Sequence, residues 1–200
     1  EFHDNAIKFL EENGFKDISG YNALKTGDKV YVSNYGKTLF AFIIGKKDLI
    51  EGMHIVGAHI DSPRIDIKQN PLYENSEIAY LDTHYYGGIK KYQWLTIPLA
   101  LHGVIIKKNG QKININIGEQ ETDPVFCITD LLPHLAQSQM KKNLSEAVEG
   151  ENLDLIVGSQ PCDEKDAKEK VKHNVLKILK QKYAITEEDF LSAELEVVPA

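Results

Sequence analysis

Apolar residues recur at helical spacing at the start of the chain, namely at Phe2, Ala6, Phe9 and Leu10. This spacing predicts an amphipathic helix, and Gly14 follows as a stop. Three β-rich segments come next, at residues 29–36, 38–45 and 54–59. The second is apolar enough to be buried on both faces, as in the centre of a sheet. The first part of the chain therefore has the pattern of an α/β structure.

From residue 64 onward, polar and apolar residues alternate as they do in strands with one buried face. Residues 64–68 and 77–83 show this alternation. Asn109-Gly110 is the strongest two-residue turn pattern in the chain, and it lies between the β-rich arms of segment 104–118. This part of the sequence predicts a mostly β structure.

Helical patterns return in the last third of the chain. Residues 128–142 predict a helix, with Asp130 as N-cap and Pro133 in the first turn. Residues 153–158 predict a strand, and Val171, Val175, Ile178 and Leu179 mark one face of a helix over about 163–182. Thr186 and Asp189 have the spacing of a capping box, and residues 194–198 predict a closing strand.

These elements divide the chain into an α/β segment over residues 1–70 and a mostly β segment with helices over 71–192. The closing strand, within residues 193–200, fits either segment. The chain has 200 residues, 42% of them hydrophobic and 26% charged, which is ordinary for a globular protein. No run approaches the roughly 20 apolar residues of a membrane span, and no basic and apolar stretch marks a signal peptide.

The net charge of −7, without a basic stripe, disfavours a nucleic-acid binder, since such proteins must neutralise phosphates. Cys127 and Cys162 lack the spacing of metal ligands, so we expect two free thiols in a reducing compartment such as the cytoplasm. The expected partners therefore include neither nucleic acid nor membrane.

His59 and Asp61 are the residues of clearest chemical interest. They follow the apolar run 54–58, and residues two apart in an extended chain project to the same side. A metal-binding imidazole uses one nitrogen for the metal and donates its other N–H to a carboxylate. One histidine cannot complete a zinc site, however, because zinc takes three or four protein ligands. Ser62 is an alternative nucleophile, although no G-x-S-x-G elbow surrounds it.

Two long motifs resemble the aspartyl aminopeptidase family of dinuclear zinc exopeptidases. They are GAHIDSPRIDIK (57–68) and THYYGGIKKYQWLTIPLALHG (83–103), and DLLPHLA (130–136) and ELEVVPA (194–200) also match in kind and order. The resemblance implies that His59 binds one of two zinc ions and that Asp61 supports it. It implies that the other ligands and the general base lie beyond residue 200, so that this chain is a fragment and is inactive alone. Some relatives carry a second functional histidine where this chain has Ser138.

The resemblance implies the first part of a zinc-peptidase α/β catalytic domain, followed by an inserted, barrel-like β-rich dimerisation domain with helices. It also implies two zinc ions (or cobalt or manganese) per full-length subunit, which would activate a water to release amino-terminal residues, acidic ones among them, from a peptide substrate. The expected partner is the protein itself, as dimers that assemble into a larger symmetric shell. Two alternatives are a non-catalytic oligomerisation or interaction module and a serine-type hydrolase using Ser62.

We expect the subunit contacts to involve residues 84–94, HYYGGIKKYQW. Gly87-Gly88 can adopt backbone angles that other residues avoid, which favours a projecting loop. Tyrosine and tryptophan are common anchors of protein interfaces. The alternative is a tight connection whose aromatic side chains fold back onto the sheet.

Overall fold

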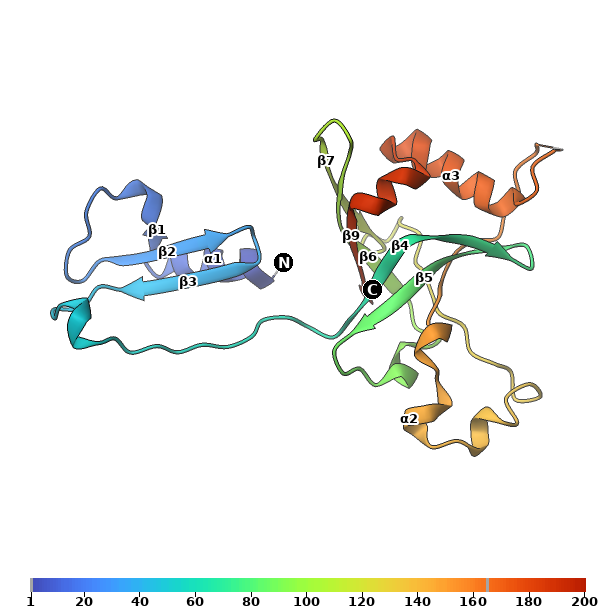
Figure 1. Ribbon diagram of the computed structural model, residues 1–200, viewed down its shortest axis with the longest axis horizontal. Helices are drawn as coiled ribbons and strands as arrows, with labels where there is room; N and C mark the ends of the chain where they lie inside the picture. The colour runs from blue at the N-terminus through green and yellow to red at the C-terminus, as the bar shows by residue number, and fades with distance from the viewer. Residues whose placement is uncertain (1, 165) are drawn as a thin grey trace. The chain divides into compact units, whose positions relative to one another are not determined.

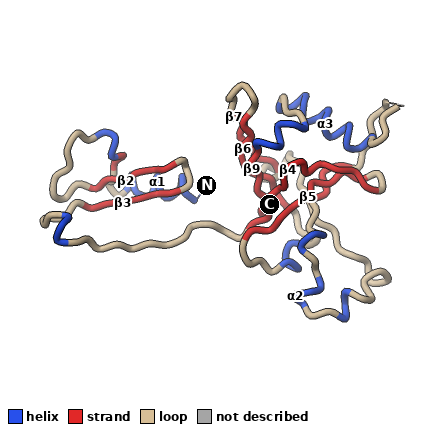
Figure 2. Tube along the Cα trace, viewed as in Figure 1, coloured by secondary structure: helices blue, strands red, loops and turns tan. Residues whose placement is uncertain are grey.

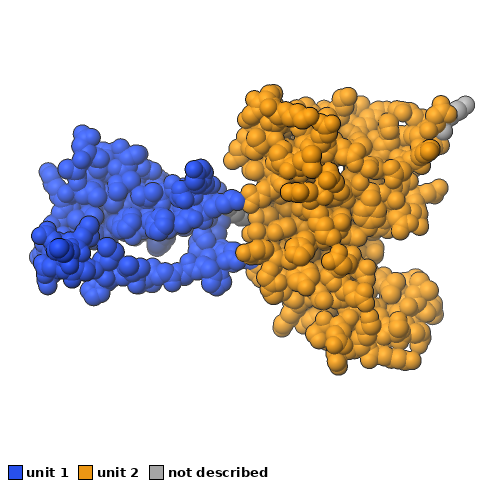
Figure 3. All heavy atoms as spheres, in the orientation of Figure 1, with its two compact units in different colours: residues 1–62 blue, residues 63–200 orange. Residues whose placement is uncertain are grey.

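The computed structural model describes residues 2–164 and 166–200, and the chain forms two compact units (Figure 3). Unit 1 is Glu1–Ser62 and unit 2 is Pro63–Ala200. Residue 70, near which the sequence predicts a domain boundary, lies inside β4 (Arg64–Asn75), and the boundary between the two compact units lies between residues 62 and 63.

The described residues of unit 1 form one α-helix, two short 3₁₀ helices and a three-stranded sheet (Figures 1 and 2). In chain order its elements are α1 (Phe2–Glu12), β1 (Lys16–Asp17), η1 (Ile18–Gly20), β2 (Lys29–Asn34), β3 (Thr38–Ile43) and η2 (Leu49–Glu51). β2 pairs in parallel with β1 and antiparallel with β3. The predicted opening helix is confirmed, and Gly14 has a positive φ of 83° just after it. Tyr31 of β2 is buried and donates its hydroxyl hydrogen to Glu11 of α1 (2.8 Å).

β3 is not buried on both faces as its apolar sequence suggests. Phe40, Phe42 and Ile43 are all exposed. β3 is an edge strand of this sheet, paired only with β2 among the described residues. A doubly buried strand needs neighbours on both edges and cover on both faces, and unit 1 supplies neither for β3.

The third predicted strand of unit 1, residues 54–59, is also absent. These residues have no regular secondary structure, and Val56 is 99% exposed. A strand exists only through hydrogen bonds to a neighbouring strand, and the sheet of unit 1 ends at β3. The apolar pattern of segment 54–59 is therefore that of a strand whose neighbours the described residues do not provide.

Unit 2 is built on a six-stranded antiparallel sheet in the order β7-β6-β9-β4-β5-β8. Its strands are β4 (Arg64–Asn75), β5 (Ile78–Tyr86), β6 (Leu99–Ile106), β7 (Lys112–Ile117), β8 (Leu155–Gly158) and β9 (Ala193–Pro199). Its helical elements are η3 (Lys91–Trp94), η4 (Gln139–Lys141), α2 (Leu144–Ala147), η5 (Gly150–Asn152), α3 (Lys170–Tyr183) and η6 (Glu187–Ser192). The closing strand β9 lies in the middle of this sheet, so it belongs structurally to unit 2.

The core of unit 2 lies on the sheet, beneath α3 and η6 (Figure 1). Its fully buried side chains include Ile65, Leu99, Ile105, Leu155, Ile185 and Val197.

The pattern of residues 163–182 correctly predicts a helix, although α3 begins only at Lys170. The capping box of Thr186 and Asp189 is confirmed, and it opens η6. The hairpin at Asn109-Gly110 is confirmed as well, but Lys107 and Gln111 still share a backbone hydrogen bond (2.9 Å), so its loop is longer than two residues.

The helix predicted over residues 128–142 does not form. Isolated turns occur there instead, with hydrogen bonds such as Ala136 N–H to the Leu132 carbonyl (3.0 Å), and only η4 is regular. Asp130 accepts from the Leu131 N–H (2.8 Å) and from Gln139 (2.9 Å) rather than capping a helix. Several apolar residues of this segment, including Leu132 and Leu135, stay exposed, whereas Ile128 and Ala136 are buried. A helix gains most of its stability by packing its apolar face, and this face has no surface to pack on here.

Two of the four aromatic side chains of segment 84–94, Tyr85 and Trp94, fold back onto unit 2, whereas Tyr86 and Tyr92 are exposed. Trp94 is only 6% exposed and belongs to the core, so the expectation that it anchors a subunit contact is wrong. Tyr85 packs against the same core beneath the ammonium group of Lys91 (5.8 Å). Tyr86 is exposed, and its ring lies 5.0 Å from the Arg64 guanidinium.

Gly103 of β6 generates a stability prediction. Its φ is +141°, and a Cβ atom there would collide with the Glu194 carbonyl oxygen of β9 and lie 2.9 Å from Leu195 Cα. Gly103→Ala should therefore lower the free energy of unfolding by about 3 kcal/mol, measured by urea denaturation followed by circular dichroism. Gly110→Ala is the matched control, because Gly110 has a φ of +82° but open space around it. Its expected cost is about 1 kcal/mol, and equal losses for the two variants would contradict the close approach of β6 and β9.

Asp189 generates a prediction about pH. It accepts hydrogen bonds from the backbone N–H (2.8 Å) and the hydroxyl (2.9 Å) of Thr186, and these hold its pKa below the ordinary value. Because the folded-state pKa is the lower one, ionised Asp189 stabilises the fold above the unfolded-state pKa, and this contribution is lost as the pH falls through the folded pKa. Asp189→Asn should therefore be less stable than the parent at neutral pH, with the difference shrinking below about pH 4 in urea denaturation. A constant difference between Asp189→Asn and the parent across this pH range would contradict this role.

Candidate metal centre

His59 and Asp61 lie in the irregular segment that ends unit 1. The side chain of His59 is 88% exposed and that of Asp61 is 52% exposed. Gly57 and Ala58 precede them, and a Cβ atom built on Gly57 would meet nothing within 4 Å. The approach to the imidazole is therefore open.

The two side chains form the pair that the sequence predicts. Nδ1 of His59 lies 2.9 Å from Oδ1 of Asp61. An ionised carboxylate only accepts hydrogen bonds, so Nδ1 of a neutral His59 carries the hydrogen and Nε2 presents its lone pair outward. This tautomer suits a metal ligand, because the carboxylate orients the ring and increases the basicity of Nε2.

Another histidine of unit 1 shows what a purely structural histidine looks like. His3 is buried in α1, and its Nδ1 lies 3.0 Å from Asp4 while its Nε2 lies 2.9 Å from the Ser33 hydroxyl of β2. Both ring nitrogens are occupied by protein groups, so His3 ties the helix to the sheet. His59 has the same kind of carboxylate partner but an outward Nε2, which distinguishes it from His3.

The described residues supply only one imidazole and its supporting carboxylate. Across residues 2–164 and 166–200, no group of three or more His, Cys, Asp or Glu side chains is placed to hold a metal ion. Zinc sites use three or four protein ligands. The pair therefore fits part of a zinc site, and the structure brings no further ligand to it.

The remaining candidates from the sequence do not join this pair. Ser62 is exposed and follows Asp61 in the same irregular segment. Cys127 and Cys162 are free thiols of unit 2, the second of them buried. His134 and Ser138 lie in the exposed turns between Asp130 and η4. The site residues predicted from the sequence thus reduce to His59 and Asp61.

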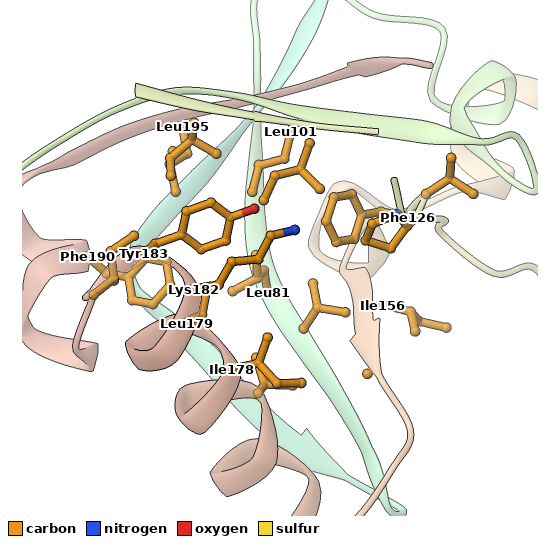
Figure 4. A pocket seen from close by; sticks show the side chains of 18 of the residues that line it. Leu81, Leu101, Phe126, Ile156, Ile178, Leu179, Lys182, Tyr183, Phe190 and Leu195 are labelled. Atoms are coloured by element: carbon orange, nitrogen blue, oxygen red, sulfur yellow. The ribbon is translucent and has the colours of Figure 1, made fainter. Parts of the chain in front are cut away.

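A feature that the sequence did not reveal is a hollow between α3 and the sheet of unit 2, of about 440 Å³. Figure 4 shows side chains from β5, β6, β8, β9, α3 and η6 around it, with Lys182 and Tyr183 among them. The apolar spacing of residues 171–179 predicts the helix that covers it. The size of the space beneath that helix depends on the distance between α3 and the sheet. The spacing of apolar residues in the sequence does not predict this distance.

Comparison with known proteins agrees with the sequence motifs. Residues 2–200 match the family described as aminopeptidase I zinc metalloprotease (M18). A probable M18 family aminopeptidase 1 from Clostridium acetobutylicum is 56% identical over 198 residues, covering 97% of this chain and 43% of that protein. Its counterpart from Thermotoga maritima is 52% identical over 193 residues, covering 96% of this chain and 42% of the relative.

Solved structures agree with these sequence matches. A crystal structure of the M18 family aminopeptidase from Thermotoga maritima has a TM-score of 0.90 at 50% identity, covering 98% of this chain and 43% of that one. The crystal structure of aminopeptidase I from Clostridium acetobutylicum has a TM-score of 0.87 at 54% identity, covering 98% and 44%. An S. cerevisiae mApe1 dodecamer has a TM-score of 0.60 at 18% identity, covering 98% and 44%, and shares the fold.

The family match and the solved structures thus place the chain in a class, the zinc metalloproteases of the aminopeptidase I type. Within that class the chain belongs to the M18 family. It spans about 43% of the length of the relatives that it matches. In the described part of the chain, no helix has the length and apolar character needed to cross a membrane.

The ligand count predicts how the 200-residue chain behaves alone. With one imidazole ligand, it should retain far less than one zinc per chain after dialysis, and it should release no amino-terminal residues even with added zinc. Atomic absorption and a panel of aminoacyl fluorogenic substrates measure the two properties. Stoichiometric zinc, or a chelator-sensitive activity of the purified chain, would contradict the ligand count.

Proposed function

We propose that the protein containing this chain is a metal-dependent aminopeptidase that releases amino-terminal residues from peptides. Membership of the M18 zinc metalloprotease family over residues 2–200 supports this activity. The observation that assigns a role in this activity to particular residues is the 2.9 Å hydrogen bond between His59 and Asp61, with Nε2 of His59 directed outward. Acidic amino-terminal residues are among the substrates that we propose.

In this proposal His59 is a zinc ligand through Nε2, and Asp61 holds the ring. Asp61 accepts the Nδ1 hydrogen, which fixes the tautomer and the direction of the Nε2 lone pair. Bound zinc, cobalt or manganese supplies Lewis acidity that acidifies water and polarises a peptide carbonyl. We propose two such ions per full-length subunit. The described residues offer one ligand, so we assign the other ligands and the general base to a protein of the relatives' full length.

The alternatives find less support. A serine hydrolase using Ser62 would need a base within hydrogen-bonding reach, and the nearby His59 pairs with Asp61 instead. A purely structural module does not account for a histidine-carboxylate pair held out into solvent at a family motif. The metalloprotease family supports the metal-dependent reaction rather than either alternative.

We also propose that residues 1–70 and 193–200 belong to the catalytic domain and that 71–192 form an inserted dimerisation domain. The two junctions then lie in β4 and at β9, which pair with each other in the sheet of unit 2. Exposed apolar residues of unit 2 support assembly with further copies of the protein: Leu131, Leu132, Leu135, Met140 and Leu144. Burying such residues is the usual drive for association, and dimers building a larger shell in the cytoplasm would do so. A monomer in analytical ultracentrifugation of the longer protein would contradict this part.

Substitution of the pair tests the proposed function in a protein of full family length. His59→Ala should abolish peptidase activity and lower bound metal by about one ion per subunit, because a histidine ligand has no local substitute. Asp61→Asn should fold normally and lose about 10- to 100-fold in turnover or metal affinity, the usual cost of losing the carboxylate behind a ligating histidine. His54→Ala is the matched control in the same segment and should retain activity. Full activity and metal content in His59→Ala would overturn the assignment.

A further inference from the structure

The hollow beneath α3, which we call the α3 hollow, lies wholly within unit 2. Its volume of about 440 Å³ is in the lower part of the range of small-molecule sites, about 300–1,000 Å³. Aliphatic and aromatic side chains line it, among them Leu81, Leu101, Phe126, Ile156, Leu179 and Phe190 (Figure 4). It is independent of the proposed metal site, since His59 and Asp61 belong to unit 1.

The packing of α3 explains why this space exists. Val171, in the first turn, is the only buried residue of the helix. Val175 and Leu179 are only partly buried against the core, and Ile178 is half exposed. The helix therefore packs closely on the sheet at its beginning and leaves space beneath its second half. Protein interiors rarely leave apolar gaps of this size, and dry apolar cavities readily take up apolar ligands.

The mouth of the hollow carries a positive charge. Lys182 is the only charged residue among the described residues that line it. The ammonium lies 5.4 Å from the centre of the Tyr183 ring, and the hydroxyl of Tyr183 and the Lys182 ammonium project into the same space (Figure 4). A cation and a hydroxyl beside an apolar space are complementary to a ligand with an apolar body and an anionic head.

The carboxyl end of α3, which lies at this mouth, repels a bound anion only weakly. The last carbonyl groups of a helix carry partial negative charge. At the end of α3, the Lys180 carbonyl accepts from Ala184 N–H (3.1 Å), and the Ala184 carbonyl accepts from the ammonium of Lys107 (2.6 Å). Lys107 therefore adds a second positive charge near the end of the same helix.

We propose that the α3 hollow binds a single-chain amphiphile with a carboxylate head, a ligand of the fatty-acid class. The hydrocarbon chain fills the space between α3 and the sheet. The carboxylate stays at the mouth, where it pairs with Lys182 and accepts a hydrogen bond from Tyr183, because a carboxylate buried without such partners would be strongly disfavoured. The aliphatic lining suits a flexible chain better than a rigid planar ring.

Titration of the whole 200-residue chain with dodecanoate, below its micelle concentration, tests the proposal by isothermal calorimetry. We expect saturable binding of one dodecanoate per chain and a rise in melting temperature. Dodecanol, which has the same chain and no charge, should bind about tenfold more weakly. Equal binding of the two would overturn the role of the anionic head, and no saturable binding of dodecanoate would overturn the site.

Variants locate the binding. Lys182→Gln should weaken dodecanoate binding about tenfold, whereas Lys180→Gln, on the same helical turn but outside the lining, should change it less than about twofold. Leu179→Trp should abolish binding by filling the hollow, and Val125→Trp, on the exposed rim, provides a second obstruction should the helix variant fail to fold. Undiminished binding in a folded obstruction variant would overturn the proposal. So would a hollow covered by another copy of the chain, seen as a dimer in solution that binds no dodecanoate.

Discussion

The antiparallel pairing of β9 with both β6 and β4 holds unit 2 together. β9 is the last strand in the sequence, yet it lies between the β6–β7 hairpin and the group β4–β5–β8 and pairs with both. Val197 is fully buried at this junction, and Arg64 of β4 reaches Glu196 of β9 (3.3 Å). The close approach of β9 also explains Gly103, which leaves room for the Glu194 carbonyl. Forming the sheet therefore requires contacts between residues more than a hundred positions apart. The loss of chain entropy in making these contacts is offset only when the core of unit 2 has formed.

The two functional features of the molecule differ in how much of the fold they need. His59 and Asp61 are two residues apart in an extended segment, so their hydrogen bond forms without any packing around it. The α3 hollow exists only because β5, β6, β8 and β9 come together beneath a helix whose second half stands off the sheet. A local pair can be recognised in a sequence, whereas a hollow is a property of the assembled unit.

The errors of the sequence analysis share one cause. Segments 54–59 and 128–142 have the apolar patterns of a buried strand and an amphipathic helix, and both are mostly irregular and mostly exposed in the structure. Trp94 shows the converse, since its place in an aromatic and glycine-rich stretch favoured an interface and the structure buries it in the core. An apolar pattern predicts that a face will be buried, but regular structure follows only where a neighbouring element covers that face or supplies hydrogen bonds.

The sequence by itself determined the features that depend on near neighbours in the chain. These include α1 and its stop at Gly14, the β6–β7 hairpin, α3, the capping box of Thr186 and Asp189, and the pairing of His59 with Asp61. Backbone geometry within a few residues fixes each of them. Only the tertiary structure decided that β9 lies in the middle of the sheet, that unit 2 begins at Pro63, and that α3 leaves a hollow. Those features depend on which elements, distant in the sequence, pack against each other. The pattern of apolar residues predicts the apolar face of each element but not the element that covers that face.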